Sequence, residues 1–409
     1  MYGVVLEGGG AKGSYHIGAY KAILELEIPV GLIAGTSIGA VNGAAMAQGD
    51  FDKAYELWWN IKNSMVFDVE DQHIEKWKNL NIDMETLDYI ASKLKDIIGK
   101  GGLDTSVMRS LLENIIDEQK LRNSEIDFAL VTVSLSDMKP VEVYKDDIPE
   151  GEIISYILAS ASFPGFKSEP VGGKLFVDGG VYNNLPINLV YQKGYKDIIS
   201  IRTHGLGREK KNVLPKGVKN IIIEPREELG KTLDFDEDVA RYNIQLGYYD
   251  AMKALKNLFG KKYYIDQMFD EKYFLSKLMD IDGSIIEIIK SKMGEKDELP
   301  AKRFLFESMI PKIIKMLELE ENTTYEELVL SLYEVLAQKY EIKRFEIYDA
   351  RDFMEIVEKE YEKRKGNARK KQKQSLIPGT WLWGEQKKKL LEEIAALIID
   401  SADFLVNNN

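Results

Sequence analysis

Short apolar runs alternate with helical patterns over the first 255 residues of this chain. The apolar runs predict strands at residues 3–6, 30–34, 128–134, 141–144, 175–177, 198–201 and 220–223. Patterns between them predict helices at residues 18–27, 39–48, 52–61 and 153–161. Strands that alternate with helices form a mainly parallel sheet with helices on both faces. We therefore expect an α/β protein with a three-layer α/β/α architecture here.

The pattern changes near residue 255. Beyond it, strand-like runs and glycine become scarce, and amphipathic patterns rich in lysine and glutamate take over. Close to the end, apolar residues recur at helical spacing, namely Leu390, Leu391, Ile394, Leu397 and Ile398. A chain of 409 residues also exceeds the usual size of a single core. We predict two domains, residues 1–255 and a helical C-terminal domain, residues 256–409, of unknown role.

Charge and composition narrow the classes of function. The formal net charge of −12 argues against a nucleic-acid partner, whose footprint on a protein is basic. The absence of cysteine excludes disulfides, thiolate metal sites and a cysteine nucleophile. The N-terminus shows no leader pattern, and no run of about 18 apolar residues predicts a membrane span. We expect a cytoplasmic protein.

The first motif that carries chemistry lies at residues 35–39, which have the pattern G-x-S-x-G around Ser37. It stands between a predicted strand and a predicted helix. A serine nucleophile needs such a tight turn, and Gly35 and Gly39 flank it because side chains there would clash. The turn also places Ser37 at a helix N-terminus, which favours developing negative charge. The alternative is a small residue that caps a helix.

The second motif is the glycine-rich stretch at residues 8–13, which again follows a strand and opens a helix. The backbone N–H groups of consecutive glycines can point together at an oxyanion. Gly8, Gly10 and Gly13 also satisfy the dinucleotide fingerprint G-x-G-x-x-G. That fingerprint requires an acidic residue at the end of the second strand, where this chain has Ser37 instead. An oxidoreductase is therefore the less favoured interpretation.

The third motif is Asp178 followed by Gly179 and Gly180, after a predicted strand. An Asp-Gly turn alone is common in proteins. A serine nucleophile, however, needs a base, and Asp178 is one candidate. The three histidines of the chain are His16, His73 and His204. The order Ser37, Asp178, His204 matches a Ser-His-Asp esterase, although in that fold the serine follows more strands than it does here.

Taken together, these motifs resemble those of the bacterial patatin-like phospholipases. That family combines a glycine-rich oxyanion loop, G-x-S-x-G and D-G-[AG] in this order. The agreement extends to residues 159–166, to residues 177–186 around Asp178, and to residues 233–248, which are similar to the closing helix of the family. The resemblance covers residues 1 to about 255. It implies a lipid acyl hydrolase, a serine carboxylic ester hydrolase that needs no cofactor or metal ion.

The resemblance also assigns roles to residues. It implies a catalytic dyad of Ser37 and Asp178 without histidine, and an acyl-enzyme intermediate. It implies an oxyanion hole built from backbone N–H groups of the loop of Gly8, Gly9 and Gly10, with Gly9 and Gly10 as the main donors. The family loop often carries an acid and an arginine where this chain has Glu7 and Lys12, and lysine lacks the planar fork of arginine. The expected substrates are phospholipids, lysophospholipids or other acyl esters.

A basic segment at residues 363–389 is the main chemical feature of the C-terminal domain. Seven lysines and arginines lie between residues 363 and 373 without an acid among them. Trp381, Trp383 and three further lysines follow. Basic clusters near tryptophan are typical of contact with anionic lipid headgroups, which predicts peripheral membrane contact. The alternative, which we favour for a charge run, is a solvated surface with the tryptophans packed in the core.

Overall fold

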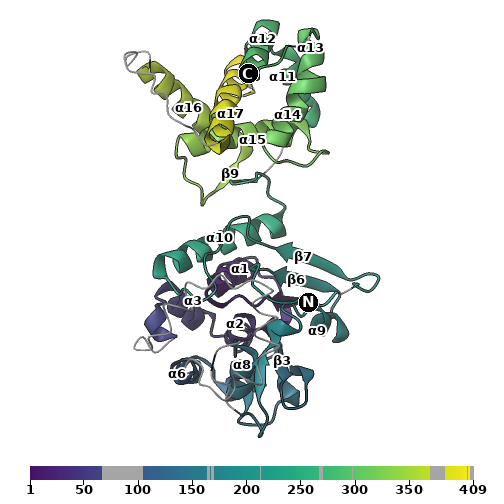
Figure 1. Ribbon diagram of the computed structural model, residues 1–409, viewed down its shortest axis with the longest axis vertical. Helices are drawn as coiled ribbons and strands as arrows, with labels where there is room; N and C mark the ends of the chain where they lie inside the picture. Colours follow the sequence, from purple (N-terminus) through teal and green to yellow (C-terminus); the bar gives the residue numbers. More distant parts are fainter. Residues whose placement is uncertain are drawn as a thin grey trace. The chain divides into compact units, whose positions relative to one another are not determined.

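The computed structural model describes residues 1–66, 105–163, 166, 170–211, 213–266, 270–296, 298–368, 383–402 and 404–405. The chain divides into two compact units, Met1–Lys256 and Asn257–Asn409 (Figure 1). This division lies one residue from the boundary expected from the sequence. The roles of the two units stay predictions at this point.

A seven-stranded sheet forms the centre of the first unit (Figure 1). Its strand order is β4-β3-β2-β1-β6-β7, and β5 pairs with β3 beside this path. The neighbouring strands in the series β3-β2-β1-β6-β7 are parallel, whereas β4 and β5 are antiparallel to β3. The strands are β1 (Tyr2–Leu6), β2 (Val30–Thr36), β3 (Asp127–Ser134), β4 (Lys139–Tyr144), β5 (Phe176–Asp178), β6 (Asp197–Ile201) and β7 (Lys219–Ile223). Every expected strand is present, and no end differs from the expected one by more than two residues.

Helices cover both faces of this sheet. On one face, Leu189 of α9 packs with Val5 of β1 and Leu32 of β2. On the other face, Gly43 of α2 lies against the side chain of Ile33. Leu32 and Ile33 are consecutive strand residues, so their side chains point to opposite faces. The expected three-layer α/β/α architecture with a mainly parallel sheet is therefore confirmed.

The helices of the first unit include all those expected from the sequence. They are α1 (Ser14–Glu25), α2 (Ile38–Ala47), α3 (Phe51–Trp59), α6 (Ser106–Ile115), α7 (Glu118–Asn123), α8 (Ile153–Ser160), α9 (Ile187–Gln192) and α10 (Glu237–Lys256). α1 begins four residues before the expected start, because a short 3₁₀ turn (Gly10–Gly13) leads from the glycine loop directly into it. The closing helix α10 begins at Glu237 rather than residue 233, where Asp236 accepts the N–H of Val239.

The second unit is built mainly of helices around its own core. They are α11 (Glu271–Asp280), α12 (Gly283–Lys292), α13 (Ala301–Phe304), α14 (Ile310–Met316), α15 (Tyr325–Lys339), α16 (Ala350–Ala368) and α17 (Trp383–Ser401). The expected helical character is confirmed, and the unit also contains a parallel pair of short strands, β8 (Tyr264–Asp266) and β9 (Ile347–Asp349). Three residues are too few to show the alternation that predicts a strand.

A buried carboxylate anchors the beginning of the second unit. Glu334 of α15 is 2% exposed. Its carboxylate accepts the backbone N–H groups of Lys261 at 2.9 Å, Lys262 at 3.0 Å and Tyr263 at 2.7 Å. Backbone donors stabilise a carboxylate that would otherwise be costly to bury. Glu334 thus holds the segment before β8 against α15.

We expect Glu334→Ala to destabilise the second unit by about 3 kcal/mol, because three backbone donors lose their buried acceptor. Glu334→Gln should cost less, since one carbonyl oxygen remains. Urea unfolding followed by circular dichroism measures both. The exposed Glu320 provides the control, and its alanine variant should stay within about 0.5 kcal/mol of wild type. A Glu334→Ala protein as stable as this control would contradict the anchoring role.

Candidate active site

Two strands that run in opposite directions end at the same point of β3. β2 is parallel to β3, and its last residue, Thr36, pairs with Val131. β5 is antiparallel to β3, and its last residue, Asp178, pairs with the adjacent Thr132. Ser37 follows Thr36 directly. The register of the sheet therefore brings Ser37 and Asp178 together, although 141 positions separate them in the sequence.

Ser37 occupies the tight turn between β2 and α2. Its backbone has φ 57° and ψ −127°, a strained conformation for a residue with a side chain. A Cβ on Gly35 would overlap the backbone of Gly39, and a Cβ on Gly39 would overlap the carbonyl of Leu6. The two glycines permit the close approach that exposes the serine, as the G-x-S-x-G pattern predicts.

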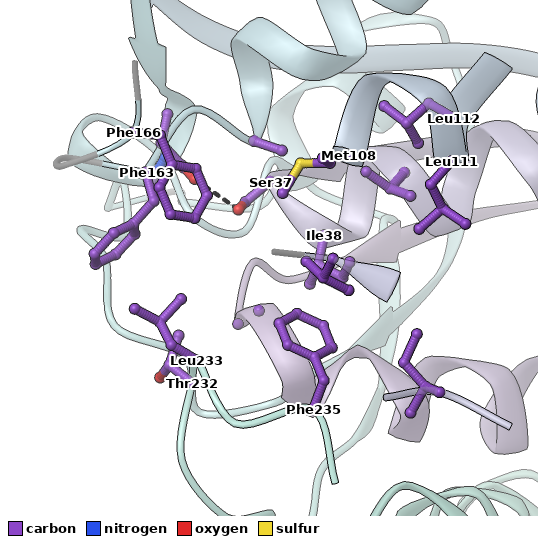
Figure 2. Close-up of a pocket in the computed structure, with 18 of the residues that line it drawn as sticks. Ser37, Ile38, Met108, Leu111, Leu112, Phe163, Phe166, Thr232, Leu233 and Phe235 are labelled. Carbon is purple, nitrogen blue, oxygen red and sulfur yellow. Dashed lines mark hydrogen bonds between the residues drawn. The ribbon is translucent and has the colours of Figure 1, made fainter. Parts of the chain in front are cut away.

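The hydroxyl of Ser37 donates a hydrogen bond to Oδ2 of Asp178, with an oxygen–oxygen distance of 2.6 Å (Figure 2). The other carboxylate oxygen, Oδ1, accepts the N–H of Gly180 at 2.7 Å. Asp178 is only 4% exposed. Burial raises the pKa of Asp178 to about 6, and the two hydrogen bonds offset part of the rise. The carboxylate is thus mostly ionised at pH 7 and is a stronger base than a solvated aspartate.

The glycine-rich loop lies beside Ser37. The N–H of Gly8 donates to the carbonyl of Asn184 at 3.1 Å, a tertiary contact with the chain after β5, so this amide already has an acceptor. Gly9 and Gly10 line the same cavity as Ser37. Among the described residues, neither amide donates to a protein acceptor.

A buried carboxylate ties this loop to the chain that follows β6. Glu7 is 1% exposed, and its Oε2 accepts the backbone N–H groups of Thr203 at 2.7 Å and His204 at 3.1 Å. The hydroxyl of Thr203 in turn donates to the carbonyl of Gly8 at 2.9 Å. Burial raises the pKa of Glu7. The chain after β6 therefore holds the loop through hydrogen bonds to both Glu7 and Gly8.

The remaining motif residues support the loop and the turns. Lys12 donates from Nζ to the carbonyl of His204 at 3.0 Å, and burial lowers the pKa of Lys12. The carbonyl of Gly13 accepts the side-chain amide of Asn42 on α2 at 2.9 Å. Gly179 lies directly against the backbone of β3. These contacts are structural, and they join the glycine loop to the helix that begins at the serine.

His204 is not arranged as the histidine of a triad. Its side chain is 51% exposed, and its Nε2 lies 3.8 Å from the carboxylate of Glu224. In a Ser-His-Asp triad the ring lies between the hydroxyl and the carboxylate. Here Ser37 and Asp178 are in direct contact. The geometry therefore does not support the triad that the order of residues permits.

His16 does not enter the site either. His16 is fully buried in α1, where its Nδ1 lies 3.3 Å from the side-chain amide of Asn42. Burial lowers the pKa of His16 to about 3, so its ring is neutral at physiological pH. His73 lies outside the described residues. Among the described side chains, no group of three or more histidines and carboxylates could hold a metal ion.

An apolar cavity of about 90 Å³ adjoins Ser37. Figure 2 shows Phe163 and Phe166 on one side of the serine and residues of α6 on the other. The apolar side chains that line it are those of Ile38, Val41, Leu57, Trp58, Ile61, Val66, Met108, Leu111, Leu112, Ile115, Ala161, Phe163, Phe166, Val181, Leu206, Leu233 and Phe235. Ligand pockets of this kind combine an apolar wall with a few polar groups. An alkyl chain suits this wall.

Several polar residues of the site have no role predicted from the sequence. Ser160 and Asn184 fall within the segments that resemble the family, and Glu7 stands next to the glycine loop. Thr203 lies outside all of the motifs and the segments that resemble the family. Their hydrogen-bond partners come from distant strands and turns, so only their closeness to the motifs could have pointed to them.

Comparison with known proteins supports the interpretation of the motifs. Residues 4–191 match the family model described as "Patatin-like phospholipase". Patatin-like phospholipase domain-containing protein 7 of Rattus norvegicus is 27% identical over 208 residues, which is 48% of this chain and 13% of that protein. The match to the family model lies within the first unit, which has a patatin-like fold. Neuropathy target esterase sws of Drosophila melanogaster is 27% identical over 204 residues, 49% of this chain and 12% of that protein.

The chain thus matches only 13% and 12% of the length of these two relatives. The expected patatin fold is confirmed, while the bacterial affiliation stays a prediction, since both relatives are animal proteins. Among solved structures, VipD from Legionella pneumophila is similar with a TM-score of 0.36 and 13% identity, over 97% of this chain and 91% of that one.

Replacing the buried carboxylate is expected to stabilise the patatin-like domain at alkaline pH. Because the folded-state pKa of Asp178 is raised from 3.8 to about 6, ionisation destabilises the folded state as the pH rises through this window. Asp178→Asn removes that penalty. The free energy of unfolding of the variant minus that of wild type should therefore increase by roughly 2–3 kcal/mol between pH 4 and pH 8. Urea unfolding at both pH values measures it, and an equal difference at both would contradict the raised pKa.

Proposed function

We propose that the patatin-like domain hydrolyses acyl esters of lipids, with Ser37 as nucleophile and Asp178 as general base. The observation that carries the proposal is the 2.6 Å hydrogen bond from the Ser37 hydroxyl to a buried carboxylate. Both residues line the apolar cavity. A nucleophile in contact with its base, next to a wall suited to an alkyl chain, is what lipid acyl transfer requires.

In the acylation step, Ser37 Oγ attacks the ester carbonyl while its proton moves to Oδ2 of Asp178. The carbonyl oxygen becomes an oxyanion, and the N–H groups of Gly9 and Gly10 are the donors available to hold it. The tetrahedral intermediate then collapses. The bond to the leaving oxygen breaks, and the alcohol or lysophospholipid leaves with the proton from Asp178. The acyl group remains on Ser37 as an ester.

In the deacylation step, water takes the place of the leaving alcohol. Asp178 accepts a proton from this water as it attacks the acyl-enzyme carbonyl, and the same two amides hold the second oxyanion. Collapse returns the proton to Ser37 Oγ and releases the fatty acid. Asp178 thus takes and returns one proton in each half of the reaction, which suits a carboxyl whose pKa lies near 6.

The apolar lining favours phospholipids, lysophospholipids and other esters with an aliphatic acyl chain over esters of polar acids. Phe163, Phe166 and the face of α6 bound the space next to Ser37 (Figure 2). Burial of each methylene group of the acyl chain contributes up to about 0.8 kcal/mol. The same wall excludes water from the carboxylate and keeps it basic.

The alternatives have weaker support. A Ser-His-Asp esterase would need the ring of His204 between the reacting pair, where the structure has a direct hydrogen bond. A nucleotide-binding oxidoreductase would need an acid at the end of β2, and Ser37 follows β2 instead. The family match at residues 4–191 likewise supports the hydrolase.

Peripheral contact with an anionic membrane through residues 363–389 stays a prediction, as does a cytoplasmic location. Residues 369–382 of this segment lie outside the described residues. Where the structure describes it, Arg364 pairs with Glu360 at 2.9 Å and Lys365 with Asp400 at 2.5 Å. Such pairing favours an ordinary charged surface there. No helix in the described ranges is long and apolar enough to cross a membrane.

Three substitutions test the dyad. We expect Ser37→Ala and Asp178→Asn each to lower the hydrolysis of a medium-chain p-nitrophenyl ester by roughly 1,000-fold or more, because they remove the nucleophile and its base. His204→Ala should retain wild-type activity. Release of p-nitrophenol measures all three, and a fluorophosphonate should label wild type but not Ser37→Ala.

Exposed residues provide the matched controls, Ser276→Ala for the serine and Asp52→Asn for the aspartate, and both should keep full activity. Full activity of Asp178→Asn would reject the proposed base. Loss of activity in a folded His204→Ala protein would instead favour the triad.

The pH dependence provides an independent test. Only the ionised carboxylate can accept the proton of Ser37, and the pKa of Asp178 is about 6. We expect kcat/KM to fall along a single limb as the pH drops below about 6, and to level off above pH 7. Initial rates between pH 4.5 and 8.5 in buffers of constant ionic strength measure this. A midpoint near 4, the value of a solvated aspartate, would contradict a buried base.

A further inference from the structure

A fully buried serine hydroxyl connects the backbone N–H of Ser37 with the backbone carbonyl of Val131. Ser160 is the last residue of α8 and has no exposed surface. Its Oγ accepts the backbone N–H of Ser37 at 3.0 Å. The same hydroxyl donates to the carbonyl of Val131 on β3 at 2.7 Å. It therefore links the turn that holds the nucleophile to β3 at the point where β2 ends.

The segment that follows Ser160 also holds the base. The backbone N–H of Asp178 donates to the carbonyl of Ser162 at 2.9 Å. Gly179, the next residue, packs so closely against Val131 that a Cβ there would overlap its carbonyl. One short segment at the end of α8 thus contacts the backbone of both Ser37 and Asp178. The carbonyl of Val131 contacts both the hydroxyl of Ser160 and the backbone of Gly179.

The backbone of Ser37 needs such support. Its φ of 57° lies in a region that residues with side chains rarely adopt. Strained conformations of this kind persist only where surrounding contacts hold them. A partly buried N–H also needs an acceptor, and the Ser160 hydroxyl supplies it where the strand leaves the sheet. Without it, the N–H of Ser37 and the carbonyl of Val131 would both lose a partner.

We infer that Ser160 is a positioning residue, whose hydroxyl holds the backbone of Ser37 in the strained turn and thereby keeps the nucleophile in contact with Asp178. The inference rests on the proposed function, since it concerns the efficiency of the same dyad. Ser160 touches no reacting atom in this scheme. Its oxygen acts through the backbone of the nucleophile, and the acyl-binding wall is formed by other residues.

Ser160→Ala removes only the hydroxyl. We expect kcat per active site to fall roughly 10- to 100-fold, because small displacements of a reacting group are costly. KM should change by less than about threefold, because the apolar wall is untouched. Ser160→Cys has nearly the same shape but makes weaker hydrogen bonds, so its kcat should lie between those of wild type and Ser160→Ala. The control is Ser200→Ala, which removes another fully buried sheet-associated hydroxyl, bonded to Asn220 at 2.8 Å.

Two further readouts separate positioning from a merely structural role. The rate at which a fluorophosphonate labels Ser37 should fall in parallel with kcat, because labelling uses the same nucleophile and needs no bound lipid. The acid limb of kcat/KM should also move to higher pH in Ser160→Ala. The hydrogen bond from Ser37 lowers the pKa of Asp178, and a displaced serine no longer provides it. A loss of stability alone would change neither the rate per active site nor the acid limb.

The positioning role is overturned if wild type is active and Ser160→Ala has the same kcat, labelling rate and acid limb per active site. An equal loss of kcat in Ser200→Ala would also overturn it, because any buried hydroxyl would then suffice. If Ser160→Ala does not fold, Ser160→Cys carries the same comparison. A wild-type protein that hydrolyses no acyl ester and takes no label at Ser37 would reject the proposed function itself.

Discussion

The active-site geometry depends on one constraint, the register of two strands against β3. β2 ends opposite Val131 and β5 ends opposite Thr132, from opposite directions. Two chain ends that meet on adjacent residues of a third strand leave little freedom for the side chains that follow. The backbone pairing of the two strands is therefore sufficient to place Ser37 and Asp178 within hydrogen-bond distance of each other. The strained turn and the packing of Gly179 both follow from this meeting point.

Burial then determines what this pair can do. Desolvation raises the pKa of Asp178 to about 6, which turns a weak base into one suited to neutral pH. The same desolvation destabilises the folded domain when the carboxyl ionises, so the basicity of the site comes at the expense of stability. Backbone hydrogen bonds limit this cost. Asp178 receives the N–H of Gly180, and Glu7 beneath the glycine loop receives two backbone N–H groups. Charged partners therefore contribute little at the dyad itself.

The matched family segment and the site do not coincide. Residues 4–191 contain Ser37, Asp178 and the glycine loop. The cavity, however, also includes Leu206, Leu233 and Phe235, which lie beyond that segment. Thr203, which supports the loop through Gly8, lies beyond it as well. The proposed dyad thus lies in the family segment, while part of the apolar cavity wall comes from residues 206–235. A search by motif finds the first part and not the second.

The sequence alone was sufficient for the strands and the sheet class, and it selected Ser37 and Asp178 as candidates, because these depend on local signals. Alternating apolar runs mark strands, and glycines mark the turns around Ser37 and Asp178. Only the tertiary structure decided that the amide of Gly8 is occupied, that His204 faces Glu224, and that Ser160 bridges Ser37 and Val131. Each of these depends on which atoms of distant segments come within about 3–4 Å of one another. Sequence patterns encode which face of an element is buried, but the partner of a single polar atom is determined by strand register and packing, and these exist only once the whole sheet has formed.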